Sequence, residues 1–357
     1  MLISILGPTY KRPHDLGEAL ESLAQQDRSL IGEIIVGDDS PTEFHAANRA
    51  AIAASGLEAL VRHVINEPPL GNYPNQWALG NAARFDHILI LHDDDHLCPG
   101  GLATLAEACA KETDERVKVW FGRSQIMDEK SRVDPVRTAA NNKEFGKDGP
   151  GAVRSVLDWS LWHAIPPNSF LIGRHTYVAL MRGPRDGNVG DWGLSVRLAN
   201  SGAFARFIAR DVSRYRVHGV SNTNAGRGVD AHYMYEIAQQ LKVSAPEHIE
   251  GKNELLRKFA AVATTRYLRD GERTAAWKCF ASPHWQWKRR VSPRGIATIG
   301  MLLTPAFCWN WALRYRGPST PQVPAAPSRP AIQVGQPSFG VAGFSGRDEG
   351  DDRSPKT

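Results

Sequence analysis

The stretch Ile88-Leu89-Ile90-Leu91-His92-Asp93-Asp94-Asp95-His96 decides how this chain folds, because four apolar residues end abruptly in three carboxylates. The apolar run has the length and branching of a buried strand in a parallel sheet. Three adjacent aspartates repel one another, and a divalent cation that carries phosphate oxygens would neutralise them. The alternative is a solvated turn, where aspartate is common. The stretch therefore predicts a strand that ends either at a metal site or in an acidic turn.

Strands and helices alternate on the N-terminal side of this stretch. Such alternation with short links indicates βαβ units and a parallel sheet, whose ligand site lies outside the carboxyl ends of the strands. No GxGxxG follows the first strand and no GxxxxGK[ST] occurs, so the dinucleotide fingerprint and the P-loop are both absent. Strands are expected at 2–6, 33–36, 61–65 and 88–91, and helices at 15–26, 43–56 and 76–84.

Polar loops follow three of these strands. They are Thr9–Arg12, Asp38–Ser40 and Asp93–Asp95. Because the carboxyl ends of parallel strands share one edge of a sheet, two acidic clusters and one basic loop are expected on the same rim.

Composition limits the class of protein. With 357 residues, 42% hydrophobic and 23% charged, the chain has the make-up of a soluble globular protein. Its four cysteines form no CxxC pair, which argues against a zinc site or a disulfide framework and favours a reducing cytoplasm. The first residues read as a strand and not as a signal peptide. A net charge of +5 suits an anionic partner such as a nucleotide, a membrane surface or a nucleic acid.

The chain beyond the acidic stretch is less regular. A strand is expected at 117–121, and residues 128–152 are polar and predict a mobile loop. A glycine-rich loop, 185–190, leads to Asp191 and a helix at 193–200. Two short strands, 204–208 and 212–217, are expected before a polar loop at 218–224.

These motifs resemble the family 2 glycosyltransferases, which have the GT-A fold. The resemblance covers about residues 1–224, and its marks occur in the family's order. They are PTYKRP at 8–13, GDDS at 37–40, HDDDHLCPG at 92–100, GDWGLSVRLANSG at 190–202 and YRVHGVS at 215–221. The resemblance implies an α/β fold of the GT-A type, with a Rossmann-like, mostly parallel central sheet flanked by helices and a helical C-terminal extension.

The resemblance also implies a metal site of the DXD type. Asp93 and Asp95 would hold Mg²⁺ or Mn²⁺ and, through it, the diphosphate of a nucleotide-sugar. Asp94 is a third candidate, because the motif can be aligned on three aspartates in more than one way. His218 would be a further ligand, and the alternative is a capped loop histidine. The family often has an acid where His92 stands.

The nucleotide would lie on the neighbouring strand ends. Asp38 and Asp39 would face the nucleobase and ribose, or else form an ordinary strand-end turn. Tyr10 could stack on the base, and Arg12 could contact phosphate. The residues that the resemblance assigns to donor binding are Pro8, Thr9, Tyr10, Arg12, Asp38, Asp39, Asn75, Gln76, Asp93 and Asp94.

Asp191 is implied to be the general base. Inversion at the anomeric carbon needs a carboxylate that takes the acceptor hydroxyl proton. A helix start at Asp191 favours its ionised form, and the residue could also serve simply as a helix cap. The family usually has Glu before this aspartate, whereas this chain has Gly190.

The C-terminal third differs in composition. The catalytic domain is expected at 1–224, a basic helical region at 225–316 and a disordered tail at 317–357. The apolar run 295–313, flanked by basic residues, predicts a peripheral membrane contact through 285–316 or, equally, a core-packing helix pair. The expected location is the cytoplasm, either free or at the inner face of the membrane.

The function expected from these features is that of an inverting, metal-dependent glycosyltransferase in polysaccharide biosynthesis. It would move a sugar from a UDP-, GDP- or dTDP-type donor to a hydroxyl of a glycan, a lipid-linked sugar or a protein. One alternative is a nucleotidyltransferase on a similar sheet, which fits poorly because GPTYKRP lacks a glycine-rich signature. The other is a non-catalytic basic protein that binds membrane or nucleic acid; for the transferase, no nucleic-acid partner is expected.

Overall fold

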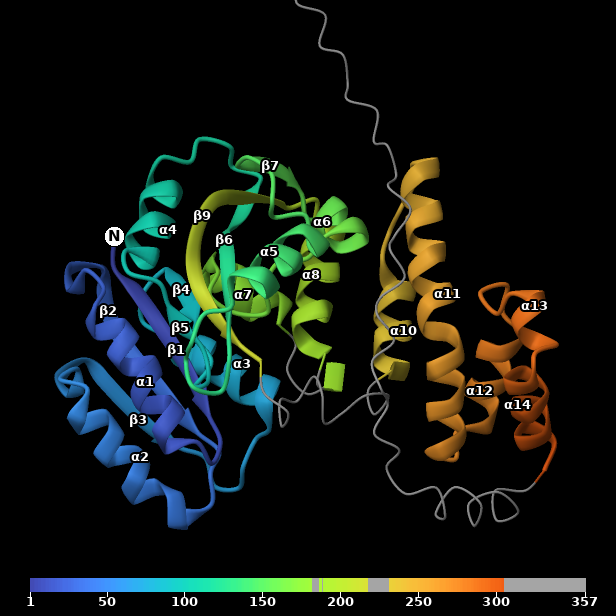
Figure 1. The fold of residues 1–357 in the computed structure, drawn as a ribbon, viewed down its shortest axis with the longest axis horizontal. Helices are drawn as coiled ribbons and strands as arrows, with labels where there is room; N and C mark the ends of the chain where they lie inside the picture. The colour runs from blue at the N-terminus through green and yellow to red at the C-terminus, as the bar shows by residue number, and fades with distance from the viewer. Residues whose placement is uncertain (182–185, 188, 218–230, 305–357) are drawn as a thin grey trace, which may run out of the picture. The chain divides into compact units, whose positions relative to one another are not determined.

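The parallel half of a central sheet occupies the N-terminal part of the chain (Figure 1). The computed structural model describes residues 1–181, 186–187, 189–217 and 231–304. The strands follow the order β3-β2-β1-β4 and are parallel, as predicted. The elements are β1 (Ile3–Thr9), α1 (Pro13–Ala24), β2 (Ile31–Asp38), α2 (Thr42–Ala54), β3 (Val61–Ile65), α3 (Asn72–Ala82) and β4 (His87–Ile90), with short 3-10 turns at Arg28–Leu30 and Glu58–Leu60.

The second half of the sheet is mixed. Strand β8 pairs antiparallel with both β4 and β6, while β6 and β9 are parallel, and β5 and β7 both run antiparallel to β9. The expected mostly parallel arrangement therefore describes the first half. The elements are β5 (His96–Leu97), α4 (Gly101–Ala110), β6 (Val117–Met127), α5 (Pro135–Glu144), β7 (Ala152–Ser155), α6 (Val156–Trp162), β8 (Leu171–Gly173), α7 (Arg174–Leu180), α8 (Gly190–Asn200) and β9 (Phe204–Arg216).

Helices cover both faces of this sheet. Successive residues of β4 point to opposite faces, so Leu89 packs into the core under α1, α2 and α4, while Ile88 and Ile90 pack under α3, α6, α7 and α8. All three side chains are fully buried. The apolar run that opens the deciding stretch is thus a central strand, as its composition predicts.

Two expectations about local structure are wrong. Residues 128–152 contain α5, which begins after Asp134, whose carboxylate accepts a 2.9 Å hydrogen bond from the backbone N–H of Arg137. This helix buries only Asn142, so it lacks the apolar stripe by which a helix is recognised. The two short strands expected at 204–208 and 212–217 are one strand, β9, whose pairing with β6 shifts register between Phe121 and Ser124.

The described C-terminal region is helical, as predicted. Helix α11 ends at Arg269, and α12 begins at Arg273. Helix α11 contacts α6, and α10 contacts α8, so these helices pack on the sheet-bearing part of the chain. The expected domain limits stay a prediction, and residues 305–357 lie outside the described part. The elements are α10 (Ala231–Gln240), α11 (Pro246–Arg269), α12 (Arg273–Ala281), α13 (Trp287–Arg290) and α14 (Pro293–Leu303).

Among the described residues, no helix combines the length and the apolar character that a membrane crossing requires. The cysteines Cys98, Cys109 and Cys279 are free thiols. The location in the cytoplasm stays a prediction.

Candidate active site

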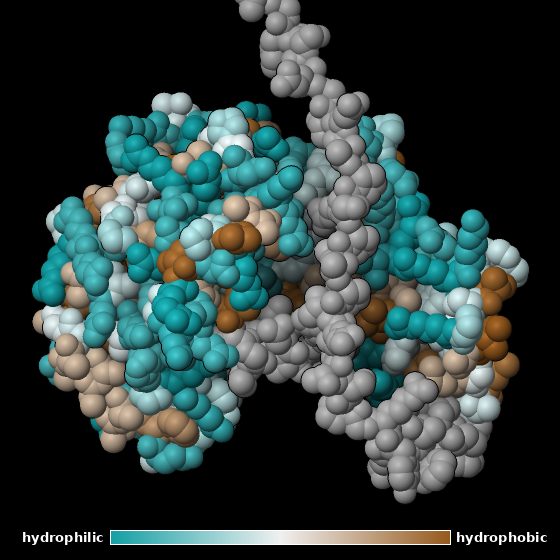
Figure 2. Space-filling model, in the orientation of Figure 1, coloured by the Kyte–Doolittle hydropathy of each residue, from teal (hydrophilic) through white to brown (hydrophobic). Residues whose placement is uncertain are grey.

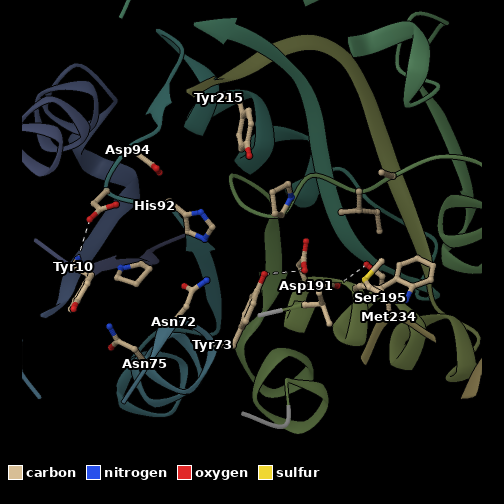
Figure 3. Close-up of a pocket in the computed structure, with 18 of the residues that line it drawn as sticks. Tyr10, Asn72, Tyr73, Asn75, His92, Asp94, Asp191, Ser195, Tyr215 and Met234 are labelled. Carbon is tan, nitrogen blue, oxygen red and sulfur yellow. Dashed lines mark hydrogen bonds between the residues drawn. The ribbon is translucent and has the colours of Figure 1, made fainter. Parts of the chain in front are cut away.

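A cavity of about 1560 Å³ opens at the carboxyl ends of β1, β2 and β4. Drug-sized ligands occupy cavities of roughly 300–1,000 Å³, so this one has room for two substrates side by side. Figure 3 shows Tyr10 and Asp94 on one side of it and Asp191, Ser195 and Met234 on the other. The predicted site residues that line it are Pro8, Thr9, Tyr10, Arg12, Asp39, Asn75, Asp93, Asp94 and Asp191.

Asp93 is bound by the loop that follows β1. Its carboxylate accepts hydrogen bonds from the Thr9 hydroxyl at 2.9 Å and the Tyr10 backbone N–H at 3.1 Å, and it pairs with Arg12 at 3.3 Å. Burial, followed by repulsion from Asp94, raises the pKa of Asp93 despite these donors. The predicted convergence of the basic loop and the acidic cluster on one rim is therefore observed.

Asp94 and Asp95 differ in position. Asp94 lines the cavity and pairs with Arg12, whereas Asp95 is buried and accepts from Asn168 Nδ2 at 2.6 Å. Ligand atoms of His92, Asp94 and Asp95 all lie within 4.8 Å of one another. Burial lowers the pKa of His92, so its imidazole is neutral and keeps a nitrogen lone pair. These three residues form a donor set that fits a divalent cation.

Arg216, which was not predicted as a site residue, donates hydrogen bonds to two residues of the acidic cluster. Its backbone N–H donates to the Asp95 carboxylate at 2.8 Å, and its side-chain Nε donates to the Asp94 carbonyl oxygen at 2.8 Å. The guanidinium also pairs with Glu18 at 2.5 Å. The motif YRVHGVS contained the signal, because Arg216 stands two residues before His218. His218, the predicted third metal ligand, lies outside the described residues.

The two aspartates at the end of β2 have different environments. Asp39 lines the cavity and accepts from the backbone N–H of Gly71 at 2.7 Å and from Asn66 Nδ2 at 2.7 Å. Asp38 has no exposed surface and accepts from Asn48 at 2.8 Å and His63 at 3.0 Å, so it holds the strand-end turn and does not face the cavity. The prediction that both carboxylates face the nucleotide is therefore corrected for Asp38.

Asn75 and Gln76 are adjacent residues of α3, but their side chains contact different neighbours. Asn75 Nδ2 donates to the Gly37 carbonyl oxygen at 2.8 Å, which ties α3 to the end of β2. Gln76 Nε2 donates to Asn72 Oδ1 at 2.9 Å and lies 3.3 Å from His92 Nε2. Gln76 is buried behind the cavity wall, where it orients His92 and does not reach the cavity.

Asp191 lies in the first turn of α8, as predicted, and faces the same cavity (Figure 3). The Tyr73 hydroxyl donates a 2.9 Å hydrogen bond to its Oδ1. Burial, then the neighbouring Asp191, raises the pKa of Tyr73, so the phenol keeps the proton it donates. Tyr73 was not predicted as a site residue, because it precedes the helix expected at 76–84 and carries no signature of its own; in the structure it lies in the first turn of α3.

The glycine before Asp191 makes room for Tyr73. A Cβ placed on Gly190 would lie 2.5 Å from Cγ of the Tyr73 ring, which is inside any normal contact. The Tyr73 ring therefore leaves no space for a side chain at position 190, where the family that the sequence resembles usually has Glu. The departure from the family pattern has a steric explanation.

Helices of the C-terminal region complete the wall beyond Asp191. Met234 from α10 and Lys258, Phe259 and Val262 from α11 line this side, which combines apolar and basic side chains. The sequence did not assign α10 or α11 to the site. Their contribution depends on long-range packing, which no local motif encodes.

Comparison with known sequences finds similarity over only part of the chain. The chain matches no protein-family model. It is 35% identical over 105 residues to an uncharacterised protein of Mycobacterium tuberculosis, a match that covers 29% of this chain and 31% of that protein. The aligned part thus spans less than a third of the length of this relative.

Crystal structures of TarS from S. aureus share the architecture. TarS residues 1–349 align with a TM-score of 0.51 and 15% identity over 85% of this chain and 80% of that one. The same fragment in complex with UDP-GlcNAc aligns with a TM-score of 0.55 and 14% identity, and in complex with UDP with 0.53 and 15%, both with the same coverage. At such low identity the likeness shows the fold, and with the strand order it gives this chain a GT-A-like fold.

Proposed function

We propose that this protein is a glycosyltransferase that moves a sugar from a nucleotide-diphosphate sugar to a hydroxyl acceptor with inversion. The observation that carries the proposal is the shared cavity, into which the acidic cluster after β4 and Asp191 of α8 both project. One carboxylate group suits a metal-bound diphosphate and the other suits an acceptor hydroxyl. A fold shared with TarS, which has been crystallised with UDP-GlcNAc, agrees with this arrangement.

The donor nucleotide would bind over the ends of β1 and β2. Tyr10 is 52% exposed at the cavity, so its ring is free to stack on a nucleobase. Asp39 Oδ2 accepts one hydrogen bond, from Gly71, and a carboxylate oxygen can accept a second from a ribose hydroxyl or a base N–H. Arg12 lines the cavity and pairs with Asp93 and Asp94, and its guanidinium can also contact phosphate there.

A divalent cation, Mn²⁺ or Mg²⁺, would be held by Asp94 and Asp95 with His92 beside them. This assignment rests on the close approach of their ligand atoms and on the exposure of Asp94 to the cavity. When bound, the ion would supply positive charge against the leaving diphosphate. Asp93 is engaged by three donors of the first loop, so we assign it to holding that loop beside the ion. The roles predicted for Asp93 and His218 as ligands stay predictions.

Asp191 is the proposed general base. The Oδ2 atom of Asp191 accepts the proton of the acceptor hydroxyl. The hydroxyl oxygen of the acceptor attacks the anomeric carbon at the same time, from the face opposite the diphosphate. The bond from the anomeric carbon to the diphosphate oxygen breaks, and its electron pair leaves with the nucleotide. Tyr73 is a positioning residue, because its hydroxyl holds Oδ1 of Asp191 by a hydrogen bond and leaves Oδ2 to act on the acceptor.

The substitution Asp191→Asn tests this assignment. It preserves the shape and the neighbours but removes the base, so transfer should fall by about 10²–10⁴-fold while nucleotide binding is retained. The measurement is product formation from a panel of UDP-, GDP- and dTDP-sugars, with binding followed separately by calorimetry. Asp148→Asn, the same change at an exposed position outside the cavity, is the matched control. Full transfer by Asp191→Asn would remove Asp191 from the base role.

A further inference from the structure

The helices α13 and α14 together carry an exposed apolar face. Trp287 and Val291 are 72% and 52% exposed, and Ile296 and Leu303 are 61% and 69% exposed. Figure 2 shows hydrophobic side chains gathered at the edge of the molecule where Figure 1 draws these two helices. Large apolar side chains this exposed and this close together usually mark a surface that binds something.

The side-chain pattern of α14 departs from that of an ordinary surface helix. Such a helix buries its apolar stripe and exposes its polar residues. Helix α14 instead buries Gly295 and Thr298, together with Leu302, while Ile296 and Leu303 face outward. Packing against the rest of the protein therefore does not account for Ile296 and Leu303. The core-packing alternative weighed from the sequence explains only the buried side.

Basic side chains accompany the apolar ones. Residues 282–304 contain Lys288, Arg289, Arg290 and Arg294 and no Asp or Glu. Within the described part of the chain, none of the four cations forms an ion pair with a carboxylate; Arg289 and Arg290 donate only to backbone carbonyl oxygens, as to Arg257 O at 3.2 Å and Ser282 O at 2.6 Å. Four positive charges without a carboxylate partner therefore accompany the exposed apolar residues, with the guanidinium of Arg290 turned toward Ala281 O, Ser282 O and the Phe280 ring.

This combination selects one kind of partner. An amphipathic surface with a tryptophan, aliphatic side chains and a cluster of Lys and Arg matches the boundary of an anionic lipid bilayer, where apolar groups insert and cations meet phosphate. A protein partner or a second copy of this chain would need acidic groups to meet the same four cations. We propose that α13 and α14 form a membrane-docking face that binds anionic phospholipid surfaces peripherally. This face is separate from the cavity and from the proposed transferase function.

The test uses the full chain and lipid vesicles of defined composition. Co-sedimentation should show binding to vesicles of phosphatidylcholine with phosphatidylglycerol, little binding to phosphatidylcholine alone, and release by added salt. The double substitution I296D/L303D should weaken this binding by about tenfold or more, because it replaces apolar insertion with anionic charge. Since both side chains are exposed, the fold should survive, as near-identical unfolding curves would show.

Val136→Asp is the matched control. Val136 is 79% exposed on α5, so the substitution adds one of the two negative charges of I296D/L303D at an apolar surface position outside the proposed face. It should leave vesicle binding within about twofold, because one distant charge is screened beyond a Debye length of about 8 Å. The proposal is overturned if the wild-type chain ignores anionic vesicles, or if both variants bind them equally. It is also overturned if the chain dimerises through this face, with I296D/L303D monomeric and no vesicle binding in either form.

Discussion

Tyr73, Gly190 and Asp191 act as one unit at the residue scale. The ring of Tyr73 fits only because position 190 has no side chain, and its hydroxyl holds Asp191 Oδ1 at 2.9 Å. The sequence identified Asp191 from its helix start and its flanking motif. It could not identify Tyr73, because 118 residues separate the two partners of this hydrogen bond.

Substitutions at positions 73 and 190 should therefore impair the same step. Tyr73→Phe removes only the hydroxyl, so kcat should fall by about tenfold or more while the KM for the donor changes little, as expected for the loss of one hydrogen bond of about 1.5–3 kcal/mol to a charged group. Gly190→Ala should lower kcat at least as much, since its methyl group would displace the ring. Steady-state kinetics check both, and Gly149→Ala, where a Cβ meets nothing within 4 Å, is the control. Unchanged kcat in both variants would contradict the positioning role.

Asp38 gives the structure a pH dependence. Burial alone would raise the pKa of this carboxyl, but hydrogen bonds from His63, Asn48 and Ser40 outweigh it and lower the pKa. Because the folded pKa lies below the unfolded one, this stabilisation is present at neutral pH and is lost as the pH falls below about 4.

The variant Asp38→Asn should reveal that contribution. We expect a loss of about 1–3 kcal/mol in the free energy of unfolding at pH 7, because the buried partners lose a charged acceptor. Urea unfolding curves recorded from pH 7 to pH 3 should show a constant difference between wild type and variant down to about pH 4 and a narrowing difference below it, because the folded pKa lies well below the unfolded one. A constant difference over that range would show that the charge of Asp38 does not matter.

At the element scale, the alternation of strands and helices made the first half of the sheet predictable. The apolar runs of β1, β2 and β4 are buried, and β3 at the edge of the sheet is half-buried. The second half was harder to predict. Strand β8 is only three residues long, and α5 has almost no buried face, so neither shows a periodic pattern. Their formation depends on neighbours that are distant in sequence.

The close fit of α3 on β2 leads to a prediction for Gly37. A Cβ at this position would lie 2.3 Å from Asn75 Oδ1 and 2.9 Å from a Leu79 methyl carbon. Gly37→Ala should therefore destabilise the fold by about 1–3 kcal/mol through overpacking. Because Asn75 also contacts the loop that holds Asp39, nucleotide binding should weaken as well. Urea denaturation and calorimetry measure the two effects, and a fully stable variant with normal binding would show that α3 can move aside.

At the scale of the whole molecule, one cavity combines residues from the parallel sheet with residues from α8, α10 and α11. The sheet side was predictable, because strand order and the carboxyl-end rule bring Tyr10, Asp39 and Asp94 together. The opposite side was predicted only at Asp191. Met234 and Phe259 contribute because α10 and α11 pack on α8 and α6, through a cluster that includes Val196 and Ile237. Such packing is not readable from short motifs.

The most direct test of the central proposal is nucleotide binding to the full chain in the presence and absence of Mn²⁺. Thermal unfolding should be recorded with UDP, GDP and dTDP, for the wild type and for Asp94→Asn. One nucleotide should raise the melting temperature when Mn²⁺ is present, since a ligand at 100 times its Kd stabilises by about 2.7 kcal/mol. The shift should be much smaller without Mn²⁺ and in Asp94→Asn, whose side chain is a poorer ligand for a hard cation. No shift with any of the three nucleotides, with or without Mn²⁺, would contradict the account.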